Sequence, residues 1–206
     1  MNVTQLREFE RFLRMLALRS SGLLNQSEAA KDVAVSPTTI ATWLSALVAS
    51  NQVFLLEPWF SNRTKSMVKT PKIYLHDTGL MNYLLGIESE AEMLRSPLLG
   101  AIWETFIFSE IRKLQTHKKG AWRLNFWSDR LKEVDFLIDR GGVLDLFECK
   151  WNEHPNADDA INLDYAHSRL KGKKVENKQV ICRSANPYPL TETASALPFG
   201  ELGTLV

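Results

Sequence analysis

Two strand-like runs on either side of Gly141-Gly142 constrain the fold of this chain more than any other feature. Residues 134–140 and 143–151 are rich in aromatic and branched apolar side chains. A Gly-Gly pair supplies the two positive-φ residues that a type I′ turn requires. A two-residue loop there also sets the pairing of the strands, with Asp135 directly opposite Glu148. The sequence therefore predicts an antiparallel β-hairpin with a defined register.

In this register three polar side chains share one face of the hairpin. Residues two apart on a strand point the same way, so Lys150 joins Asp135 and Glu148. Directly opposed Cβ atoms lie about 4.5–5.5 Å apart, which lets two carboxylates share one divalent cation beside an ammonium group. A four-residue loop centred on Arg140-Gly141 would leave Asp135 diagonal to Glu148 on the same face. A three-residue loop would place them on opposite faces and remove the cluster.

Apolar residues surround these polar ones. The same register forms three apolar pairs, which are Val134 with Cys149, Phe136 with Phe147, and Leu137 with Leu146. Strands that are apolar on both faces belong inside a sheet covered by helices on both sides. Carboxylates in such a place are costly unless they are paired or bound to a metal. Two interpretations stay open: a catalytic metal site, and a buried ion pair of Lys150 with Glu148 or Asp135 without chemistry.

Composition indicates a soluble globular protein with a substantial core. The chain has 206 residues, of which 45% are hydrophobic and 24% charged, enough for one large or two small domains. A net charge of +1 provides no global basic field, so any contact with nucleic acid has to come from a local patch. Cys149 and Cys182 lie in apolar runs and are expected to be buried free thiols in a reducing compartment. With no membrane-spanning run and no secretory signal, we expect a cytoplasmic protein.

The first 90 residues contain a helix-turn-helix pattern. Periodic apolar residues predict a helix over 4–18, and Asn25 with Glu28 three residues later marks the start of a second helix. Ser36-Pro37 marks the start of a third helix, because serine caps an N-terminus and proline suits the first helical position. Two short strands, 53–56 and 72–75, follow with a loop between them. We therefore predict a winged-helix domain over residues 1–90.

The two surfaces on which such a domain contacts DNA differ in composition. The loop between the strands is basic, and Arg63, Lys65 and Lys69 could contact nucleic-acid phosphates there. The third helix exposes only small residues, which are Thr38, Thr39, Ala41, Thr42 and Ser45. None of these bonds a base edge in the bidentate way that arginine or asparagine does. The domain is expected either to touch phosphates through its wing or to serve as a protein-interaction or spacer module.

Residues 91–206 predict a second domain, a mixed sheet with helices on its faces. A largely apolar helix over 98–115 contains Glu104, a carboxylate that lies at the margin of the apolar stripe or has a buried partner. The remaining elements are a strand over 123–127, the hairpin, a helix over 157–170 and a strand over 178–183. The order is α-β-β-β-α-β, so we expect an α/β chain with an α+β mixed sheet.

A helix with Glu, a strand with Asp and a strand with Glu-x-Lys, in this order, resemble the PD-(D/E)xK restriction-endonuclease-like fold. The resemblance assigns catalytic roles to Glu104, Asp135, Glu148 and Lys150. It implies that Asp135 and Glu148 bind Mg²⁺ or Mn²⁺, with the Cys149 carbonyl as a further ligand. Glu104 would hold a second metal ion or its water. Lys150 would orient the attacking water and stabilise developing charge.

Three basic residues of the same domain are candidates for contact with a nucleic-acid backbone. Arg123, Arg130 and Lys132 are expected near the same edge of the sheet as the hairpin. A solvent-exposed rim explains them equally well, since most exposed basic side chains have no binding role.

Four longer segments resemble one family over nearly the whole chain. They are RFLRMLALRSSGLLNQSEAAKDVAVSPTTIATWLSALVASNQVFLLEPW, KTPKIYLHDTGLMNYLLGI, LLGAIWETFIFSEI and EVDFLID with LFECKW. They look like the C-terminal region of a prokaryotic family of predicted AAA-superfamily ATPases, in which a nucleotide-binding core precedes a winged helix and a nuclease-like domain of unknown function. This chain contains no G-x-x-x-x-G-K-[ST] phosphate loop, so we expect no ATP site in it. The chain is then either a fragment or a stand-alone relative, and an ATPase core is a candidate partner.

Two functions from different classes follow from these resemblances. The first is a metal-dependent nucleic-acid phosphodiesterase or nucleic-acid-binding module. The second is a catalytically inactive scaffold for protein interaction or effector recognition. Binding of a divalent metal separates them, because a scaffold whose Lys150 neutralises the carboxylates leaves no site for a cation.

Overall fold

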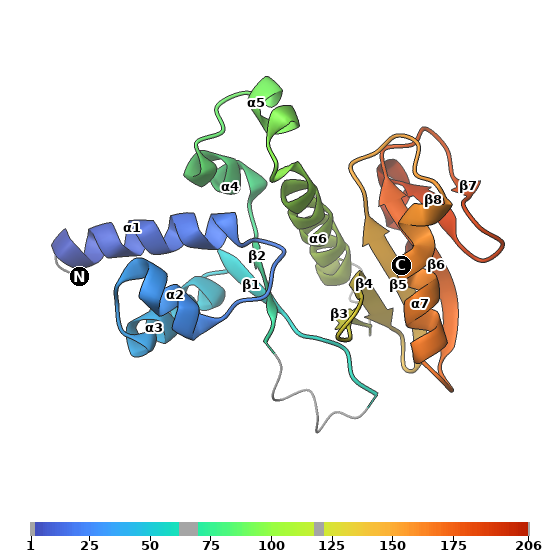
Figure 1. Ribbon diagram of the computed structural model, residues 1–206, viewed down its shortest axis with the longest axis horizontal. Coiled ribbons are helices and arrows are strands. Elements are labelled where there is room, and N and C mark those ends of the chain that lie inside the picture. Colours follow the sequence, from blue (N-terminus) through green and yellow to red (C-terminus); the bar gives the residue numbers. More distant parts are fainter. Residues whose placement is uncertain (1–2, 62–69, 118–121, 206) are drawn as a thin grey trace. The chain divides into compact units, whose positions relative to one another are not determined.

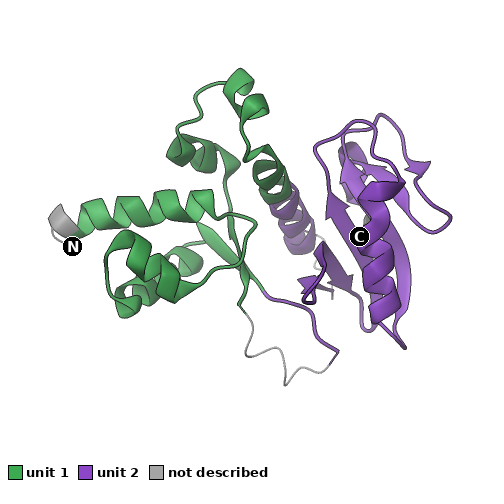
Figure 2. Cartoon of the chain, in the orientation of Figure 1, with its two compact units in different colours: residues 1–56, 70–106 green, residues 57–69, 107–206 purple. Residues whose placement is uncertain are grey.

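The computed structural model describes residues 3–61, 70–117 and 122–205 (Figure 1). The chain is a mixed α/β protein, with N-terminal helices and a small hairpin followed by a six-stranded mixed sheet with helices. Two compact units are distinguished in Figure 2. Unit 1 comprises Met1–Leu56 and Thr70–Phe106, and unit 2 comprises Glu57–Lys69 and Ile107–Val206.

Three helices and two antiparallel strands form the first part of unit 1. They are α1 (Val3–Leu18), α2 (Gln26–Val33), α3 (Pro37–Ala49), β1 (Val53–Leu56) and β2 (Lys72–Leu75). The predicted start signals are confirmed. The Asn25 side chain accepts hydrogen bonds from the amides of Ser27 and Glu28, and the Ser36 hydroxyl accepts one from Thr39. The predicted basic residues Arg63, Lys65 and Lys69 lie outside the described residues.

Unit 1 continues through α4 (Thr78–Leu85), α5 (Glu90–Arg95) and the first turns of α6 (Leu99–His117). Its core contains fully buried Phe12, Leu16, Ile40 and Ile73, together with Ile102 from α6. The sequence predicts a boundary between residues 90 and 91, where α5 begins. The two compact units themselves divide within α6, where Ile102 packs in the core of unit 1.

Unit 2 is built on a six-stranded sheet in the order β3-β4-β5-β6-β8-β7. The strands are β3 (Arg123–Ser128), β4 (Glu133–Asp139), β5 (Val143–Cys149), β6 (Lys174–Cys182), β7 (Tyr188–Pro189) and β8 (Ser195–Pro198). Strands β3, β4 and β5 are antiparallel neighbours, whereas β5, β6 and β8 run parallel. Between β5 and β6 the chain crosses over through the 3₁₀ turn η2 (Ala157–Ala160) and helix α7 (Ile161–Arg169).

The predicted hairpin forms in the predicted register. Phe136 pairs with Phe147 and Leu137 with Leu146, and the Arg140 amide donates to the Val143 carbonyl at 2.8 Å, closing a two-residue loop. Gly141 and Gly142 have φ values of 72° and 105°. These values suit a type I′ turn, whose central residues both need positive φ.

Helices cover both faces of this sheet. Leu137 and Leu146 pack in one cluster with Leu163 and Ala166 of α7. Phe136 points to the opposite face, because side chains alternate along a strand, and its ring lies 6.2 Å from that of Phe108 in α6. This explains why both hairpin strands are apolar on both sides.

Two parts of the sheet were not predicted. Strand β8 pairs in parallel with β6, and β7 pairs with β8, within a C-terminal region that ends in the 3₁₀ helix η3 (Phe199–Leu205). At the other edge, residues 57–59 run beside β3: the Phe126 amide donates to the Glu57 carbonyl at 3.2 Å, and the Trp59 amide donates to the Phe126 carbonyl at 2.6 Å. This segment covers backbone groups that an edge strand would otherwise expose.

Both cysteines are free thiols, as predicted. Cys182 is buried as expected, but the expectation that Cys149 is also buried was wrong, because Cys149 is half-buried at the end of β5. Across the described parts of the chain, no single helix is both long and apolar enough to cross a membrane. The bent pair of α2 and α3 reaches the required length and composition, with an angle of 106° between the two helices.

Candidate active site

The end of the hairpin remote from its turn brings together Asp135, Glu148 and Lys150, hereafter the carboxylate–lysine trio. Regular strand pairing ends at Phe136 and Phe147, and one further step in the same register would bring Asp135 opposite Glu148. The Cys149 amide donates to Asp135 Oδ2 at 2.9 Å, which ties this carboxylate to the neighbouring strand. Lys150 Nζ lies 3.6 Å from Glu148 Oε2. The hairpin register and these contacts bring the three side chains together.

Glu148 and Lys150 differ in their exposure to solvent. The Glu148 side chain is 4% exposed, whereas that of Lys150 is 38% exposed. A buried carboxylate requires a partner, and the Lys150 ammonium supplies one while it still reaches solvent. A ligand approaching from solvent would therefore meet Lys150 before Glu148.

The charge of Lys150 is set by its neighbours. Burial alone lowers the pKa of the ammonium, but the negative charges of Glu148, Asp135 and Asp159 outweigh that effect and raise the pKa above its ordinary value. Lys150 is therefore protonated at neutral pH. It can act as a fixed positive charge or hydrogen-bond donor, but not as a general base.

Two residues beside the trio were missed in the sequence. Asn162, in the first turn of α7, places its Nδ2 at 3.5 Å from Glu148 Oε1. Asp159 belongs to η2, where its Oδ2 accepts a hydrogen bond from the Asn156 amide at 3.0 Å. Asn156 and Asp159 form a capping box, and their spacing is visible in the sequence. That signal predicts where the helix begins, and so predicts that Asp159 and Asn162 follow strand β5 at the same end of the sheet.

Glu104, the fourth predicted catalytic residue, belongs to unit 1. Its Oε1 accepts hydrogen bonds from Lys72 Nζ at 3.0 Å and from the Tyr74 hydroxyl at 2.6 Å. Lys72 and Tyr74 both lie in β2 and are buried. The sequence left open whether this carboxylate lies at the margin of the apolar stripe or has a buried partner; Lys72 and Tyr74 are its buried partners. The structure brings Asp135, Glu148 and Lys150 together within unit 2 and places Glu104 in a polar group of unit 1.

The trio has the donor chemistry of a magnesium site, but with few protein ligands. Among the residues that the structure describes, no group of three or more His, Cys, Asp or Glu side chains is arranged to hold a metal ion. Mg²⁺ is commonly bound through one or two carboxylates while it keeps several waters. Asp135, Glu148 and the Cys149 carbonyl provide oxygen donors of that kind. The residues present therefore fit a hydrated divalent cation rather than a fully protein-coordinated one.

The predicted nucleic-acid contacts of unit 2 lie at two ends of β3. Arg130 and Lys132 are exposed in the turn between β3 and β4, which adjoins the beginning of β4 near Asp135. Arg123 begins β3 at the other end, where its NH2 lies 2.8 Å from Asp139 Oδ2. Only Arg130 and Lys132 are thus at the trio's end of the hairpin.

Comparisons with known proteins place this arrangement among domains without an assigned activity. Residues 1–91 match "Domain of unknown function (DUF8612)" and residues 99–202 match "Domain of unknown function (DUF4143)". Two similar curated proteins are uncharacterized protein Mb2031c of Mycobacterium bovis and uncharacterized protein Rv2008c of Mycobacterium tuberculosis. Each is 30% identical over 191 residues, which cover 92% of this chain and 41% of the relative.

Among solved structures, protein VC1899 from Vibrio cholerae is similar at 15% identity with a TM-score of 0.34. That alignment covers 97% of this chain and 50% of the other. The chain spans about two fifths of the length of the curated relatives it matches, since 41% of each is covered. On the match over residues 99–202, which is half of its length, this chain belongs to the DUF4143 family.

Proposed function

We propose that unit 2 is a metal-dependent nucleic-acid phosphodiesterase of the PD-(D/E)xK kind. One observation carries the proposal: the hairpin brings Asp135, Glu148 and Lys150 together, with Glu148 buried and the Lys150 ammonium protonated. The order α6-β3-β4-β5-α7-β6 agrees with the αβββαβ order of that fold. Two carboxylates beside a fixed cation are suited to a reaction in which negative charge builds up on a phosphate.

The chain's own residues have distinct tasks in this proposal. Asp135 and Glu148 would hold the cation, with the Cys149 amide fixing the orientation of the Asp135 carboxylate and Asn162 close to Glu148. Bound Mg²⁺ or Mn²⁺ would polarise the phosphodiester and lower the pKa of a nearby water. Lys150 would donate to a phosphate oxygen and offset the charge that develops there. Arg130 and Lys132, exposed at the same end of the hairpin, would contact the backbone of the substrate.

We further propose that the N-terminal unit is a winged helix and that the chain corresponds to the C-terminal module of an AAA-type ATPase family protein. Three helices followed by the antiparallel pair of β1 and β2 support the first part. Similarity to relatives of which this chain covers 41% is consistent with the second part. A nucleotide-binding core would then be supplied by another part of such a protein or by a partner.

A second candidate is a catalytically inactive scaffold in which Lys150 serves as the counter-ion of Glu148. The specific observation in its favour is that the described residues contain no group of three or more metal-ligating side chains of the types His, Cys, Asp and Glu. Removing one partner of a buried ion pair is destabilising, so the same residues would be needed for folding alone. Metal binding distinguishes the two candidates.

Calorimetric titration of Mn²⁺ tests the proposal directly. We expect wild type to bind about one or two ions per chain, and Asp135→Asn to bind none while retaining its circular dichroism spectrum. Asp32→Asn is the matched control, since Asp32 is a surface carboxylate of unit 1 that pairs with Arg19. Cleavage of labelled single- and double-stranded DNA and RNA should then fall at least about 100-fold in Asp135→Asn and Lys150→Met. A folded wild type that binds no Mn²⁺ would establish the scaffold instead.

A further inference from the structure

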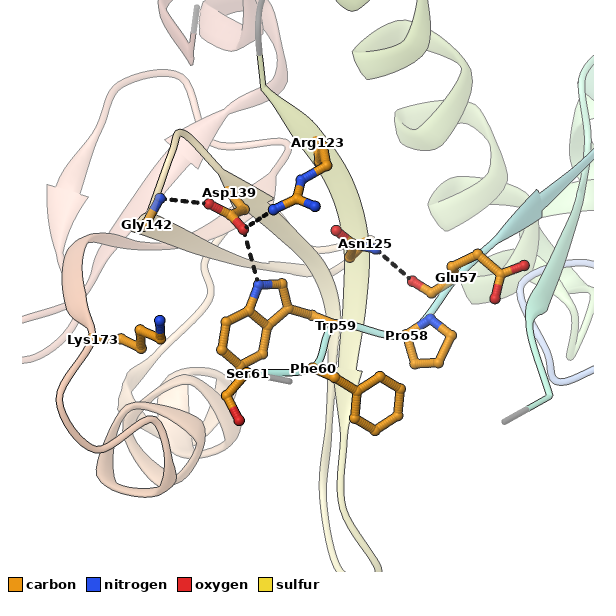
Figure 3. A pocket seen from close by; sticks show the side chains of 10 residues that line it. All are labelled: Glu57, Pro58, Trp59, Phe60, Ser61, Arg123, Asn125, Asp139, Gly142 and Lys173. Atoms are coloured by element: carbon orange, nitrogen blue, oxygen red, sulfur yellow. Dashed lines mark hydrogen bonds and ion pairs between the residues drawn. The ribbon is translucent and has the colours of Figure 1, made fainter. Parts of the chain in front are cut away.

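A concave surface lies at the turn end of the same hairpin. Two adjoining hollows of about 280 Å³ and 260 Å³ are both lined by Trp59, Phe60 and Lys173, and we name them together the Trp59 groove. Figure 3 shows the first hollow, with Gly142 and Asp139 of the hairpin beside the indole. Asp139 lies four residues from Asp135 along β4, or about 13 Å at the rise of a strand. The groove is thus distinct from the carboxylate–lysine trio.

The indole of Trp59 is held in place by hydrogen bonds. Its Nε1 donates to Asp139 Oδ2 at 3.3 Å, and its backbone amide donates to the Phe126 carbonyl. Asp139 is itself fixed by the Gly142 amide and by Arg123, each at 2.8 Å. Burial raises the pKa of the Asp139 carboxyl, but these hydrogen bonds and the Arg123 charge lower it overall, so the carboxylate is ionised at neutral pH. Trp59 is therefore a half-buried aromatic ring with a fixed orientation.

Basic residues at the end of α7 and directly after it lie beside this ring. The sequence RLKGKK, residues 169–174, contains four of them. Arg169 lies 3.7 Å from Asp129 and Lys174 lies 3.0 Å from Glu176, so these two charges are partly neutralised. Within the described parts of the chain, no ion pair involves Lys171 or Lys173, and both line the groove.

The carboxylates that line the groove do not neutralise the positive charges of Lys171 and Lys173. Asp139 and Asp129 pair with Arg123 and Arg169 respectively. Glu57 also lines the first hollow, and burial raises the pKa of its carboxyl. In Figure 3 the Glu57 carboxylate points away from Trp59 and Lys173. The surface around the indole therefore attracts anions.

We infer that the Trp59 groove binds single-stranded nucleic acid, with a base stacked on Trp59 and neighbouring phosphates against Lys171 and Lys173. Proteins that bind single strands combine a basic groove with aromatic rings on which bases stack. Lys173 Nζ lies over the Trp59 ring, 6.0 Å from its centre, so a base that stacks on this face would take the place of the ammonium and leave it free to contact an adjacent phosphate. An acidic peptide would use the lysines but would have no need of a fixed aromatic ring. The inference goes beyond the proposed reaction, because it involves neither a metal nor the trio.

Fluorescence anisotropy with a fluorescein-labelled 12-mer of thymidine, in EDTA, tests this inference. Lys171→Ala/Lys173→Ala should weaken binding and reduce the slope of log K against log salt by about 1.4, since each phosphate contact on a single strand contributes about 0.7. Trp59→Leu should weaken binding at least about fivefold through lost stacking. Trp59→Phe keeps a ring for stacking and should bind more tightly than Trp59→Leu even though it loses the bond to Asp139.

Lys31→Ala/Lys113→Ala is the matched control, because it removes two exposed lysines outside the groove. It should leave the salt slope at the wild-type value. The inference is overturned if this control weakens binding as much as the groove variant, or if a polyglutamate peptide of equal charge competes as well as the oligonucleotide. EDTA removes the divalent cation on which the proposed phosphodiesterase depends, so this binding assay does not test that reaction. Failure of the proposed phosphodiesterase therefore leaves this inference intact, and failure of the groove leaves the Mn²⁺ titration unaffected.

Discussion

At the scale of single residues, Lys72 is a deeply buried charge with a defined carboxylate partner. Its side chain is 2% exposed and lies 3.0 Å from Glu104, whose own side chain is 14% exposed. Taking an ammonium out of water is costly, and a carboxylate that also accepts from Tyr74 offsets that cost only while it stays ionised. This gives Glu104 a role in the stability of unit 1 that is independent of any chemistry.

Glu104→Ala should therefore lower the free energy of unfolding by about 3–5 kcal/mol, because it leaves the Lys72 ammonium buried without this carboxylate. Urea denaturation followed by circular dichroism measures the change. Glu10→Ala is a control in the same unit, since the Glu10–Arg14 pair is exposed and should contribute only about 0.3–0.5 kcal/mol. If the two substitutions cost the same, Glu104 has no structural role, and its assignment to catalysis gains weight.

At the scale of secondary-structure elements, the β4–β5 turn decides whether either proposed site forms. The turn sets the register that brings Asp135 to Glu148 at one end. At its own end the Gly142 amide donates to Asp139, which in turn binds the indole of Trp59. Both glycines have positive φ, a conformation that a side chain disfavours.

Gly142→Ala should lower the free energy of unfolding by about 1–2 kcal/mol. A Cβ at Gly142 would meet no atom within 4 Å, so the cost would come from the backbone conformation and not from a clash. Gly100→Ala is the matched control: a Cβ there also meets no atom within 4 Å, but Gly100 lies in helix α6. It should be neutral or stabilise by up to about 1 kcal/mol. Equal thermal shifts for the two alanine variants would contradict this account of the turn.

At the scale of the whole molecule, α6 belongs to both compact units. Ile102 packs in the core of unit 1, and Phe108, less than two turns later, contacts Phe136 of unit 2. The helix is continuous from Leu99 to His117. Loss of either core would expose the apolar side chains of one half of this helix and remove support from the other half.

We therefore expect the two units to unfold in one transition. Incorporation of 5-fluorotryptophan gives separate ¹⁹F signals for Trp43 in unit 1 and Trp127 in unit 2. Their urea midpoints should coincide, as a two-state transition requires. A Trp43 midpoint clearly below that of Trp127 would show that the helix does not couple the units.

The sequence by itself determined the hairpin and the starts of the helices, because these depend on residues close together in the chain. Two glycines and the apolar pattern around them were enough to place Phe136 opposite Phe147. Asn25 and Ser36 likewise marked the starts of their helices, because each side chain accepts hydrogen bonds from amides two or three residues later. From that register the sequence also predicted that the side chains of Asp135, Glu148 and Lys150 lie together on one face of the hairpin.

Only the tertiary structure decided which distant residues meet. Trp59 reaches Asp139 across 80 positions, and Glu104 binds Lys72 across 32. The parallel pairing of β8 with β6 could not be predicted either, because no short turn connects these two strands. Such contacts depend on how whole elements pack, and hydrophobic burial drives that packing without specifying in the local sequence which side chains will meet.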